Sequence, residues 1–216
     1  MRAVVDGPIG EEILSYLEPH GLIGLAYYDS GARSFYNNQR RILSPADLVG
    51  LKVRVQNSAL SVAMVQALGG NPTPMGFGQV YESLLLGTID GSENNWPSYE
   101  STGHYEAARH YTLTRHTMMP EVLVMSKHRW EKLSLNHQKL IRRAAKASVP
   151  FMRKQWDKRV AFSRAKVLQA GTMVVENPDL RPFSDAMRPV YERFVTSEKM
   201  RGLLKRIQTV QEDKML

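Results

Sequence analysis

Residues 51–97 read LKVRVQNSALSVAMVQALGGNPTPMGFGQVYESLLLGTIDGSENNWP, and this stretch decides the fold. Two valines alternate with polar residues over 52–56, which predicts a short strand. Apolar residues at helical spacing over 58–68, followed by two glycines, predict a helix. A second helix is predicted over 78–86, and a brief strand over 88–90. This alternation of strands with helices is typical of an α/β fold with parallel or mixed strands.

The same alternation continues outside this stretch. Further strands are expected over 22–28, 111–115, 121–125 and 172–175, and further helices over 9–19, 97–108, 134–169, 183–195 and 199–211. The segments 29–38 and 71–75 are rich in turn residues or proline, so we expect loops there, the first of them a crossing point between two lobes. Pro150 lies inside the predicted helix over 134–169 and should kink it, because proline removes one backbone hydrogen bond.

The bulk composition is that of an ordinary globular protein. The chain has 216 residues, of which 43% are hydrophobic and 23% charged. It has no cysteine, which excludes disulfides and thiolate chemistry. No apolar run approaches the roughly 18 residues of a membrane span, so the chain is not expected to span a membrane. The first residues lack the apolar core of a signal peptide, so no export signal is expected in the chain as written.

The net charge of +8 is concentrated in one segment. Residues 127–166 contain 13 lysines and arginines but only two acids, Glu131 and Asp157. Such a segment could be a face for nucleic acid or for an anionic membrane, or it could be a solvated helix. Because neither zinc-finger spacing nor an RNA-binding aromatic motif accompanies it, the sequence favours the solvated helix and predicts no nucleic-acid partner.

The histidines and glycines do not form a metal or cofactor motif. His104, His110 and His116 are six residues apart, which is not the spacing that places ligands on one helix face. Gly76 and Gly78 begin a dinucleotide fingerprint, but a tyrosine stands where its third glycine belongs. We therefore predict no metal and no cofactor.

The sequence also argues against an enzyme. Asp90 and Glu93 could act as a general acid and base, but an acid that follows a strand more often caps the next element. No nucleophile occurs in a pattern that would supply its base, and no GxSxG motif is present. We therefore expect no catalytic residues.

What remains is a set of residues suited to binding an organic acid. The two arginines can each offer a planar fork to a carboxylate, and the amides can hydrogen-bond hydroxyls or the same carboxylate. The aromatic rings offer apolar faces to a sugar ring or carbon chain. For each arginine alone, the alternative is a surface salt bridge. The candidate ligand-binding residues are Arg33, Arg54, Asn57, Phe77, Asn94, Asn95 and Trp96.

Three segments carry a family resemblance. They are LKVRV (51–55), ALGGNPTPMGFGQVYESLLLGTIDGSEN (67–94) and the pair TLTRH (112–116) and PEVLVMSKHRWEKLSLNHQKLIRRAA (120–145). In order and spacing they resemble the periplasmic solute-binding proteins of tripartite ATP-independent periplasmic (TRAP) transporters, of the DctP-like, C4-dicarboxylate-binding type. The resemblance covers roughly residues 7–195.

The resemblance implies a two-lobe periplasmic-binding-protein fold (type II-like) with a long kinked helix spanning both lobes. Arg54 would form a bidentate salt bridge with the ligand carboxylate and Asn94 would hydrogen-bond it, while Arg33, Asn57 and Phe77 match other ligand-facing positions. Gln79 replaces a glutamate common in the family. The family's proteins begin with a leader and about a hundred further residues, so this chain is expected to be N-terminally truncated and its first lobe incomplete. Residues 1–28 and 120–159 would be the remnant of the first lobe, and 29–119 and 160–216 the second lobe.

The resemblance also implies a function and partners. Members bind succinate-like acids, keto acids, sialic acid or sugar acids, and deliver them in the periplasm to a TRAP membrane permease. The run from Asn94 to Tyr99, together with Gln56 and Asn57, looks most like the binders of uronates, so a uronate such as glucuronate or galacturonate is expected. A C4-dicarboxylate or a keto acid is the alternative ligand, and an enzyme acting on such acids is the alternative function.

Overall fold

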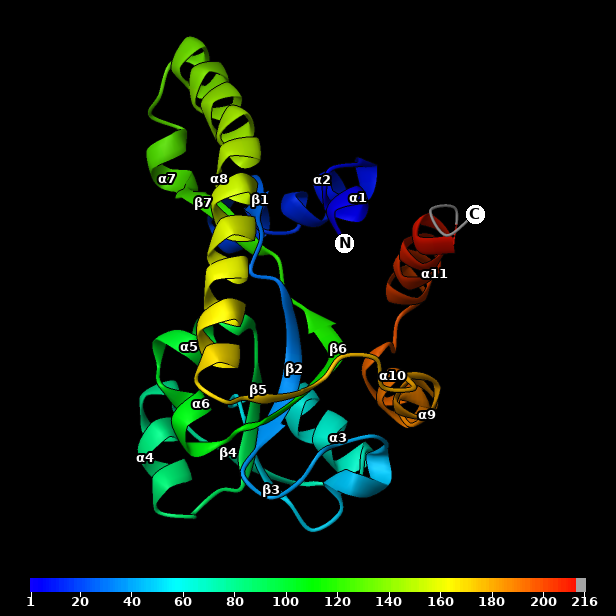
Figure 1. The fold of residues 1–216 in the computed structure, drawn as a ribbon. Coiled ribbons are helices and arrows are strands. Elements are labelled where there is room, and N and C mark those ends of the chain that lie inside the picture. The colour runs from blue at the N-terminus through cyan, green and yellow to red at the C-terminus, as the bar shows by residue number, and fades with distance from the viewer. Residues whose placement is uncertain (213–216) are drawn as a thin grey trace. The chain divides into compact units, whose positions relative to one another are not determined.

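The computed structural model describes residues 1–212 and divides the chain into two compact units (Figure 1). Unit 1 comprises Met1–Gly31, Met119–Lys158 and the segment from Thr196 on, and unit 2 comprises Ala32–Met118 and Arg159–Val195. The segment from Thr196 on was assigned to the second lobe from the sequence, but its contacts group it with unit 1. Residues 213–216, the end of that predicted lobe, lie outside the described residues.

Unit 1 is built on a two-stranded antiparallel sheet. Strand β1 (Leu22–Tyr28) pairs with β7 (Glu121–Ser126), close to the predicted strands. Its helices are α1 (Arg2–Val5), α2 (Pro8–Ser15), α7 (Lys127–Trp130), the first part of α8 (Leu135–Gln169) and α11 (Glu198–Glu212). The core of this unit joins β1 to the helices α7 and α8 through Ile23, Leu25, Ala26, Trp130 and Ala145.

The C-terminal helix belongs to unit 1 because it packs on the first two helices. Arg206 of α11 donates to Glu12 of α2 over 2.6 Å. The ammonium of Lys199 lies 3.7 Å from the centre of the Tyr16 ring. These contacts join residues nearly two hundred positions apart, which local sequence patterns do not reveal.

Unit 2 is built on a six-stranded mixed sheet of order β4-β3-β5-β2-β6-β8. Its strands are β2 (Ala32–Asn37), β3 (Lys52–Val55), β4 (Asn71–Pro74), β5 (Gly91–Asn94), β6 (His110–Met118) and β8 (Met173–Val175). Strand β3 runs parallel to β4 and to β5, and β8 runs parallel to β6, whereas β2 is antiparallel to both of its neighbours. The predicted α/β class with mixed strands is therefore confirmed.

Helices cover the unit 2 sheet, and the central strand β2 is buried on both faces. The helices are α3 (Ala59–Ala67), α4 (Val80–Leu85), α5 (Trp96–Ser101), α6 (His104–Ala107), the end of α8, α9 (Arg181–Asp185) and α10 (Arg188–Phe194). Because successive strand residues point to opposite faces, Phe35 joins one hydrophobic cluster with Val53 and Val55. Its neighbour Tyr36 joins the other, with Tyr99 and Tyr111.

The expected loop over 29–38 is wrong, because most of it forms β2. The turn residues occupy only the ends of that segment. The middle, Ser34–Tyr36, is buried, and Phe35 and Tyr36 pair with both neighbouring strands. The expected loop over 71–75 is also wrong, because residues 71–74 form β4 at the edge of the sheet. Proline has no backbone N–H to donate to a neighbouring strand. Two prolines are tolerated in β4 because an edge strand has no neighbour on one side.

The predicted strand over 88–90 lies three residues later, as β5. Gly91 allows this placement, because a Cβ at that position would lie 2.3 Å from the Tyr36 carbonyl oxygen of β2. The predicted helix over 97–108 is two helices, α5 and α6, divided at Gly103, whose φ of 72° lies in the left-handed region.

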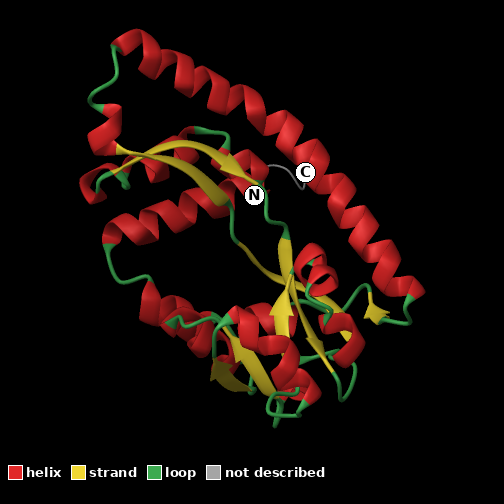
Figure 2. Cartoon of the chain, turned by 90° about the vertical axis from the view of Figure 1, so that its left-hand side faces the viewer, coloured by secondary structure: helices red, strands yellow, loops and turns green. Residues whose placement is uncertain are grey.

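The long helix predicted over 134–169 is confirmed as α8, which is a single helix from Leu135 to Gln169 with Pro150 inside it (Figure 2). The kink at Pro150 stays a prediction. Over residues 1–212, no helix combines the length and the apolar character needed to cross a membrane.

Candidate carboxylate-binding site

The candidate site lies at the carboxyl ends of two neighbouring parallel strands of unit 2. Strand β3 carries Arg54 and pairs with β5, which carries Asn94 as its last residue. The Ser92 hydroxyl of β5 donates to the Arg54 carbonyl over 3.3 Å and ties the two strands together next to these side chains. The carboxyl ends of adjacent parallel strands are a common place for a ligand.

Arg54 is a buried cation that has no carboxylate partner among residues 1–212. Only 3% of the residue is exposed. Its Nε and Nη2 atoms both donate to the carbonyl oxygen of Met75, over 3.1 and 2.9 Å. Burial lowers the pKa of its guanidinium, partly offset by the nearby charge of Glu93. The Met75 carbonyl occupies the Nε–Nη2 edge of the fork, and no hydrogen bond within residues 1–212 engages Nη1.

Phe77 lies beside this guanidinium. The Cζ atom of Arg54 is 5.7 Å from the centre of the Phe77 ring, and the ring stands edge-on to His104 at 5.8 Å. Phe77 is 43% exposed at the start of a 3₁₀ turn (Phe77–Gln79). Gln79 accepts the Gly76 N–H in this turn over 3.2 Å, so its side chain holds the loop. An exposed ring next to a cation suits a ligand that has both an acid group and a carbon ring.

Asn94 presents its amide in a single orientation. Its Oδ1 atom accepts two hydrogen bonds of 2.9 Å, one from Arg33 Nη1 and one from the Asn95 backbone N–H. Both partners are N–H groups that can only donate a hydrogen bond, so the Asn94 atom that faces them must be the oxygen. The Nδ2 amino group is therefore the part of this buried side chain that remains to donate to a ligand.

Arg33 supports this arrangement with most of its fork. It donates through Nε and Nη2 to the two carboxylate oxygens of Glu93, over 2.5 and 2.7 Å, and through Nη2 to the Glu93 carbonyl over 2.8 Å. Burial opposes the ionisation of Glu93, but the nearby His116 and the hydrogen bonds from Arg33 outweigh it and hold the pKa of this carboxyl below its usual value. Arg33 is thus paired inside the unit, whereas Arg54 is not.

The other predicted residues, Asn57, Asn95 and Trp96, lie at or next to the starts of helices α3 and α5. Asn57 is exposed in the turn before α3, where Ser58 accepts the Ser61 N–H and caps the helix. Asn95 caps α5, because its Oδ1 accepts the Ser98 N–H over 2.8 Å. Trp96 is half-buried and stacks on Tyr111, with ring centres 4.0 Å apart. The structure therefore brings Arg33, Arg54, Asn94 and Phe77 together and gives Asn95 and Trp96 packing roles as well.

Sequence reasoning missed the polar residues behind the site. Glu93 was considered as a catalytic acid, but it is buried against Arg33, and its Oε2 lies 3.4 Å from His116 Nε2. Asp90 accepts the Lys52 backbone N–H over 2.7 Å, as a capping acid does. No local signal was available, because the strand was predicted over 88–90 and Glu93 lies in β5, three residues later. Residues 1–212 contain no group of three histidines or acids placed to hold a metal ion.

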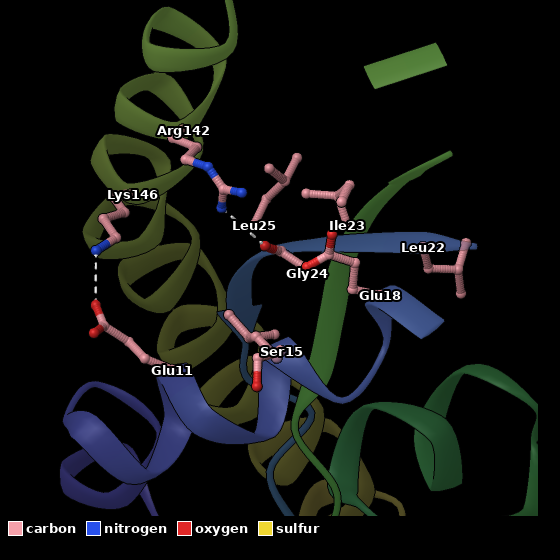
Figure 3. A pocket seen from close by; sticks show the side chains of 10 residues that line it. Glu11, Ser15, Glu18, Leu22, Ile23, Gly24, Leu25, Arg142 and Lys146 are labelled. Carbon is pink, nitrogen blue, oxygen red and sulfur yellow. Dashed lines mark hydrogen bonds and ion pairs between the residues drawn. The ribbon is translucent and has the colours of Figure 1, made fainter. Parts of the chain in front are cut away.

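Unit 1 has a separate hollow of about 230 Å³ between α2, β1 and α8 (Figure 3). Its charged groups already have partners inside the unit. Lys146 lies 3.1 Å from Glu11. Arg142 donates to the Gly24 carbonyl over 3.4 Å and lies over the Trp130 ring, but unlike Arg54 it is exposed to solvent. This hollow therefore lacks the unpaired buried cation that distinguishes the site in unit 2.

The groups that unit 2 offers to a ligand are all donors. They are the Nη1–Nη2 end of Arg54 and the Nδ2 group of Asn94, with the Phe77 ring beside them. The acceptors nearby, Glu93 and the Asn94 oxygen, are occupied by Arg33. Donors and a buried positive charge favour an anionic acceptor such as a carboxylate.

The chain is similar to known solute-binding proteins along nearly its whole length. Residues 1–198 match the model of one protein family, DctP, described as bacterial extracellular solute-binding protein, family 7. A solute-binding protein of Chromohalobacter salexigens is 44% identical over 212 residues, which are 98% of this chain and 63% of that protein. The chain thus spans less than two thirds of that relative's length.

Solved structures extend the comparison. A TRAP periplasmic solute-binding protein of a Bradyrhizobium species, in complex with D-galacturonate, is 57% identical and has a TM-score of 0.90, over 96% of this chain and 69% of that one. Another, from Chromohalobacter salexigens with bound D-glucuronate, is 44% identical and has a TM-score of 0.92, over the same shares. The predicted two-lobe periplasmic-binding-protein fold is confirmed by these likenesses.

Proposed function

The chain belongs to family 7 of the bacterial extracellular solute-binding proteins, the DctP family, and from this premise we propose that it captures an organic acid for a TRAP transporter. In this proposal, Arg54 and Asn94 bind the carboxylate of the ligand, and Phe77, Asn57, Asn95 and Trp96 line the space for the rest of it. The protein acts in the periplasm and delivers its ligand to the membrane permease subunits.

One observation carries the proposal: Arg54 is buried, and no carboxylate of the described chain pairs with it. A buried cation without a partner is unfavourable unless something compensates it. Two hydrogen bonds to the Met75 carbonyl hold the guanidinium in place without neutralising it. A ligand carboxylate at the Nη1–Nη2 end would supply the missing charge and two parallel hydrogen bonds.

The ligand we propose is a uronate. The two similar structures described above hold D-galacturonate and D-glucuronate. A hexuronate carries one carboxylate for Arg54, a ring face for the exposed Phe77 side chain and several hydroxyls for amides. A C4-dicarboxylate has a second carboxylate, for which unit 2 offers no second unpaired buried arginine among residues 1–212, since Arg33 is paired with Glu93.

We propose binding without chemical conversion. The polar groups near Arg54 are poor bases: Glu93 is held by Arg33, and burial and the charge of Arg54 lower the pKa of His104 to about 4, which makes its imidazole weakly basic. His104 is also bonded to the Tyr36 hydroxyl through Nδ1 over 2.7 Å. In this proposal the basic residues of α8 form a solvated helix face and do not bind nucleic acid.

The test is a thermal-shift and calorimetry panel on the protein as its organism produces it. D-galacturonate, D-glucuronate, succinate, 2-oxoglutarate and N-acetylneuraminate are compared, with D-galactose as the neutral control. A ligand that binds only the native state raises the unfolding midpoint. We expect a shift with a uronate, none with galactose, and an unchanged uronate by NMR after incubation. If none of the acids in the panel raises the unfolding midpoint, the binding function is contradicted. If the acid is consumed during incubation, an enzyme is supported instead.

A further inference from the structure

The part of α8 that belongs to unit 1, residues 135–158, has a buried side and an exposed side. The buried side packs with β1 and α7 through Ile141, Ala145 and Val149. On the opposite side, six exposed residues fall within about 80° of one another around the helix axis, at about 100° for each residue. We call them the outer face of α8: Leu140, Arg143, Ala147, Phe151, Lys154 and Lys158.

Two large apolar side chains of the outer face lie in water. Phe151 is 67% exposed and Leu140 is 50% exposed. Because eleven residues separate them, they lie on the same side of the helix, about 16 Å apart along its axis. An amphipathic helix of a globular protein normally turns its large apolar residues toward the core and its polar residues outward. The outer face departs from this rule while the inner side of the same helix follows it.

The cations of the outer face have no acidic partner. Arg143, Lys154 and Lys158 are exposed, and none of them forms an ion pair within the part of the chain that the structure describes. The single acid of residues 135–158 is Asp157, which is paired with Arg2 over 2.7 Å. The outer face therefore presents three uncompensated positive charges.

The other cations of this part of α8 are bonded inside unit 1. Lys146 pairs with Glu11 over 3.1 Å, and Arg153 pairs with Asp6 over 2.7 Å. Arg142 donates to a backbone carbonyl of β1. The helix thus separates its cations by side, because those that turn toward the unit have partners and those that turn away do not.

Charge and exposed apolar groups together indicate the kind of partner. Like charges repel, so this face does not suit a second copy of itself. Nucleic acid would attract the cations, but its phosphate backbone offers no apolar medium for Leu140 and Phe151. An anionic bilayer satisfies both groups, because apolar side chains enter the boundary between head groups and acyl chains while long basic side chains reach the phosphates.

We propose that the outer face of α8 binds peripherally to the surface of an anionic phospholipid bilayer. This inference goes beyond the capture of an organic acid, and it requires neither the ligand nor the clamp. The attraction of basic residues to anionic lipid is screened by salt, so the association is reversible. The face is solvated whenever the protein is away from the membrane.

The test is co-sedimentation of the protein, as its organism produces it, with lipid vesicles in the absence of ligand. Vesicles of phosphatidylglycerol and phosphatidylcholine in equal parts are compared with vesicles of phosphatidylcholine alone. We expect binding to the anionic vesicles at low salt, a steep loss of binding as salt is added, and no binding to the neutral vesicles. Absence of binding to the anionic vesicles would overturn the proposal, as would equal binding to both kinds.

A matched pair of charge reversals locates the binding face. Lys154→Glu is compared with Lys205→Glu, which changes the net charge equally at an exposed position of α11 in the same unit. We expect Lys154→Glu to weaken binding to anionic vesicles about 25-fold, since each basic residue near such a surface contributes about 1 kcal/mol and the reversal counts twice. Lys205→Glu should weaken it less than about twofold. Equal losses in the two variants contradict the proposal.

A second pair tests the apolar contribution. Phe151→Ser should weaken vesicle binding about fivefold, whereas Leu86→Ser, at a residue of unit 2 that is 72% exposed, should leave it unchanged. In addition, Phe151→Trp should give a tryptophan emission that moves to shorter wavelength on anionic vesicles, relative to the wild-type protein. An emission that does not respond to vesicles, or equal losses in the two serine variants, would show that Phe151 does not enter the bilayer.

The altered side chains are exposed, so each variant should keep the wild-type unfolding midpoint and the wild-type affinity for D-galacturonate. A parallel titration with a DNA duplex separates the two anionic partners. A protein that binds the duplex but no vesicle would show that nucleic acid is the partner and that the proposal is wrong. Vesicle binding and organic-acid binding are measured separately, so either proposal can fail while the other stands.

Discussion

Replacing Arg54 by alanine should abolish most of the ligand affinity while leaving the fold nearly intact. The side chain is 3% exposed, and the proposed ligand carboxylate meets the Nη1–Nη2 end of its fork. Truncating one partner of a buried, hydrogen-bonded charge pair costs about 2–5 kcal/mol of binding free energy. That is a loss of about 30- to 4,000-fold in affinity, at 1.4 kcal/mol for each factor of ten.

The ligand-free protein should respond far less. Arg54→Ala removes two hydrogen bonds to the Met75 carbonyl, but it also removes a buried cation that has no carboxylate partner in the described chain. These two effects oppose each other, so we expect the free energy of unfolding to change by less than about 1.5 kcal/mol. A matched control is Arg40→Ala, which removes an exposed arginine of the same unit that also bonds two carbonyl oxygens.

The assay is isothermal titration calorimetry with D-galacturonate, beside a urea unfolding curve of each ligand-free variant. We expect Arg54→Lys to lie between wild type and Arg54→Ala, because lysine keeps the charge but not the fork. An Arg54→Ala variant that binds within threefold of wild type would show that the carboxylate is held elsewhere. An equal loss in Arg40→Ala would show that the assay reports general damage to unit 2.

Three further predictions concern the stability of unit 2. Gly91→Ala should lower the free energy of unfolding by about 1–3 kcal/mol in a urea titration, because the new Cβ would lie 2.3 Å from the Tyr36 carbonyl and wedge β5 from β2; a variant as stable as wild type would contradict the close approach. His104 has a pKa lowered to about 4 by burial, so its contribution is present in full above pH 6.5 and is lost as the pH falls toward 4, by up to about 3 kcal/mol. The His104→Gln variant should lack this slope, and identical slopes in wild type and variant would refute the prediction. Glu100→Gln should destabilise the protein by about 1–3 kcal/mol in thermal unfolding, because its buried carboxylate accepts from Arg159 and Lys166 of α8 over 2.5 and 2.6 Å; a neutral effect would mean that these bonds add nothing net.

The elements around the clamp could be predicted because their signals are local. The alternation of Val53 and Val55 with polar residues placed Arg54 on a strand, and the helix after it ended at a pair of glycines as expected. Each of these signals lies within a few residues of the feature it predicts.

The support behind the clamp could not be predicted, because it depends on register between distant strands. Arg33 meets Glu93 only because β2 pairs with β5 so that Phe35 lies opposite Glu93. The turn residues that flank β2 concealed this strand, and the pairing joins residues 60 positions apart. His116 joins the same cluster through a third strand, β6, where the register shifts near Arg33.

The central claim is that unit 2 holds a ligand carboxylate between Arg54 and Asn94, and a crystal structure of the natural protein grown with D-galacturonate tests it most directly. We expect the sugar carboxylate within hydrogen-bond distance of Arg54 Nη1 and Asn94 Nδ2, with Arg33 still paired to Glu93 and the sugar ring against Phe77. A galacturonate whose carboxylate is bound away from Arg54, with the guanidinium still contacting only the Met75 carbonyl, would contradict the account.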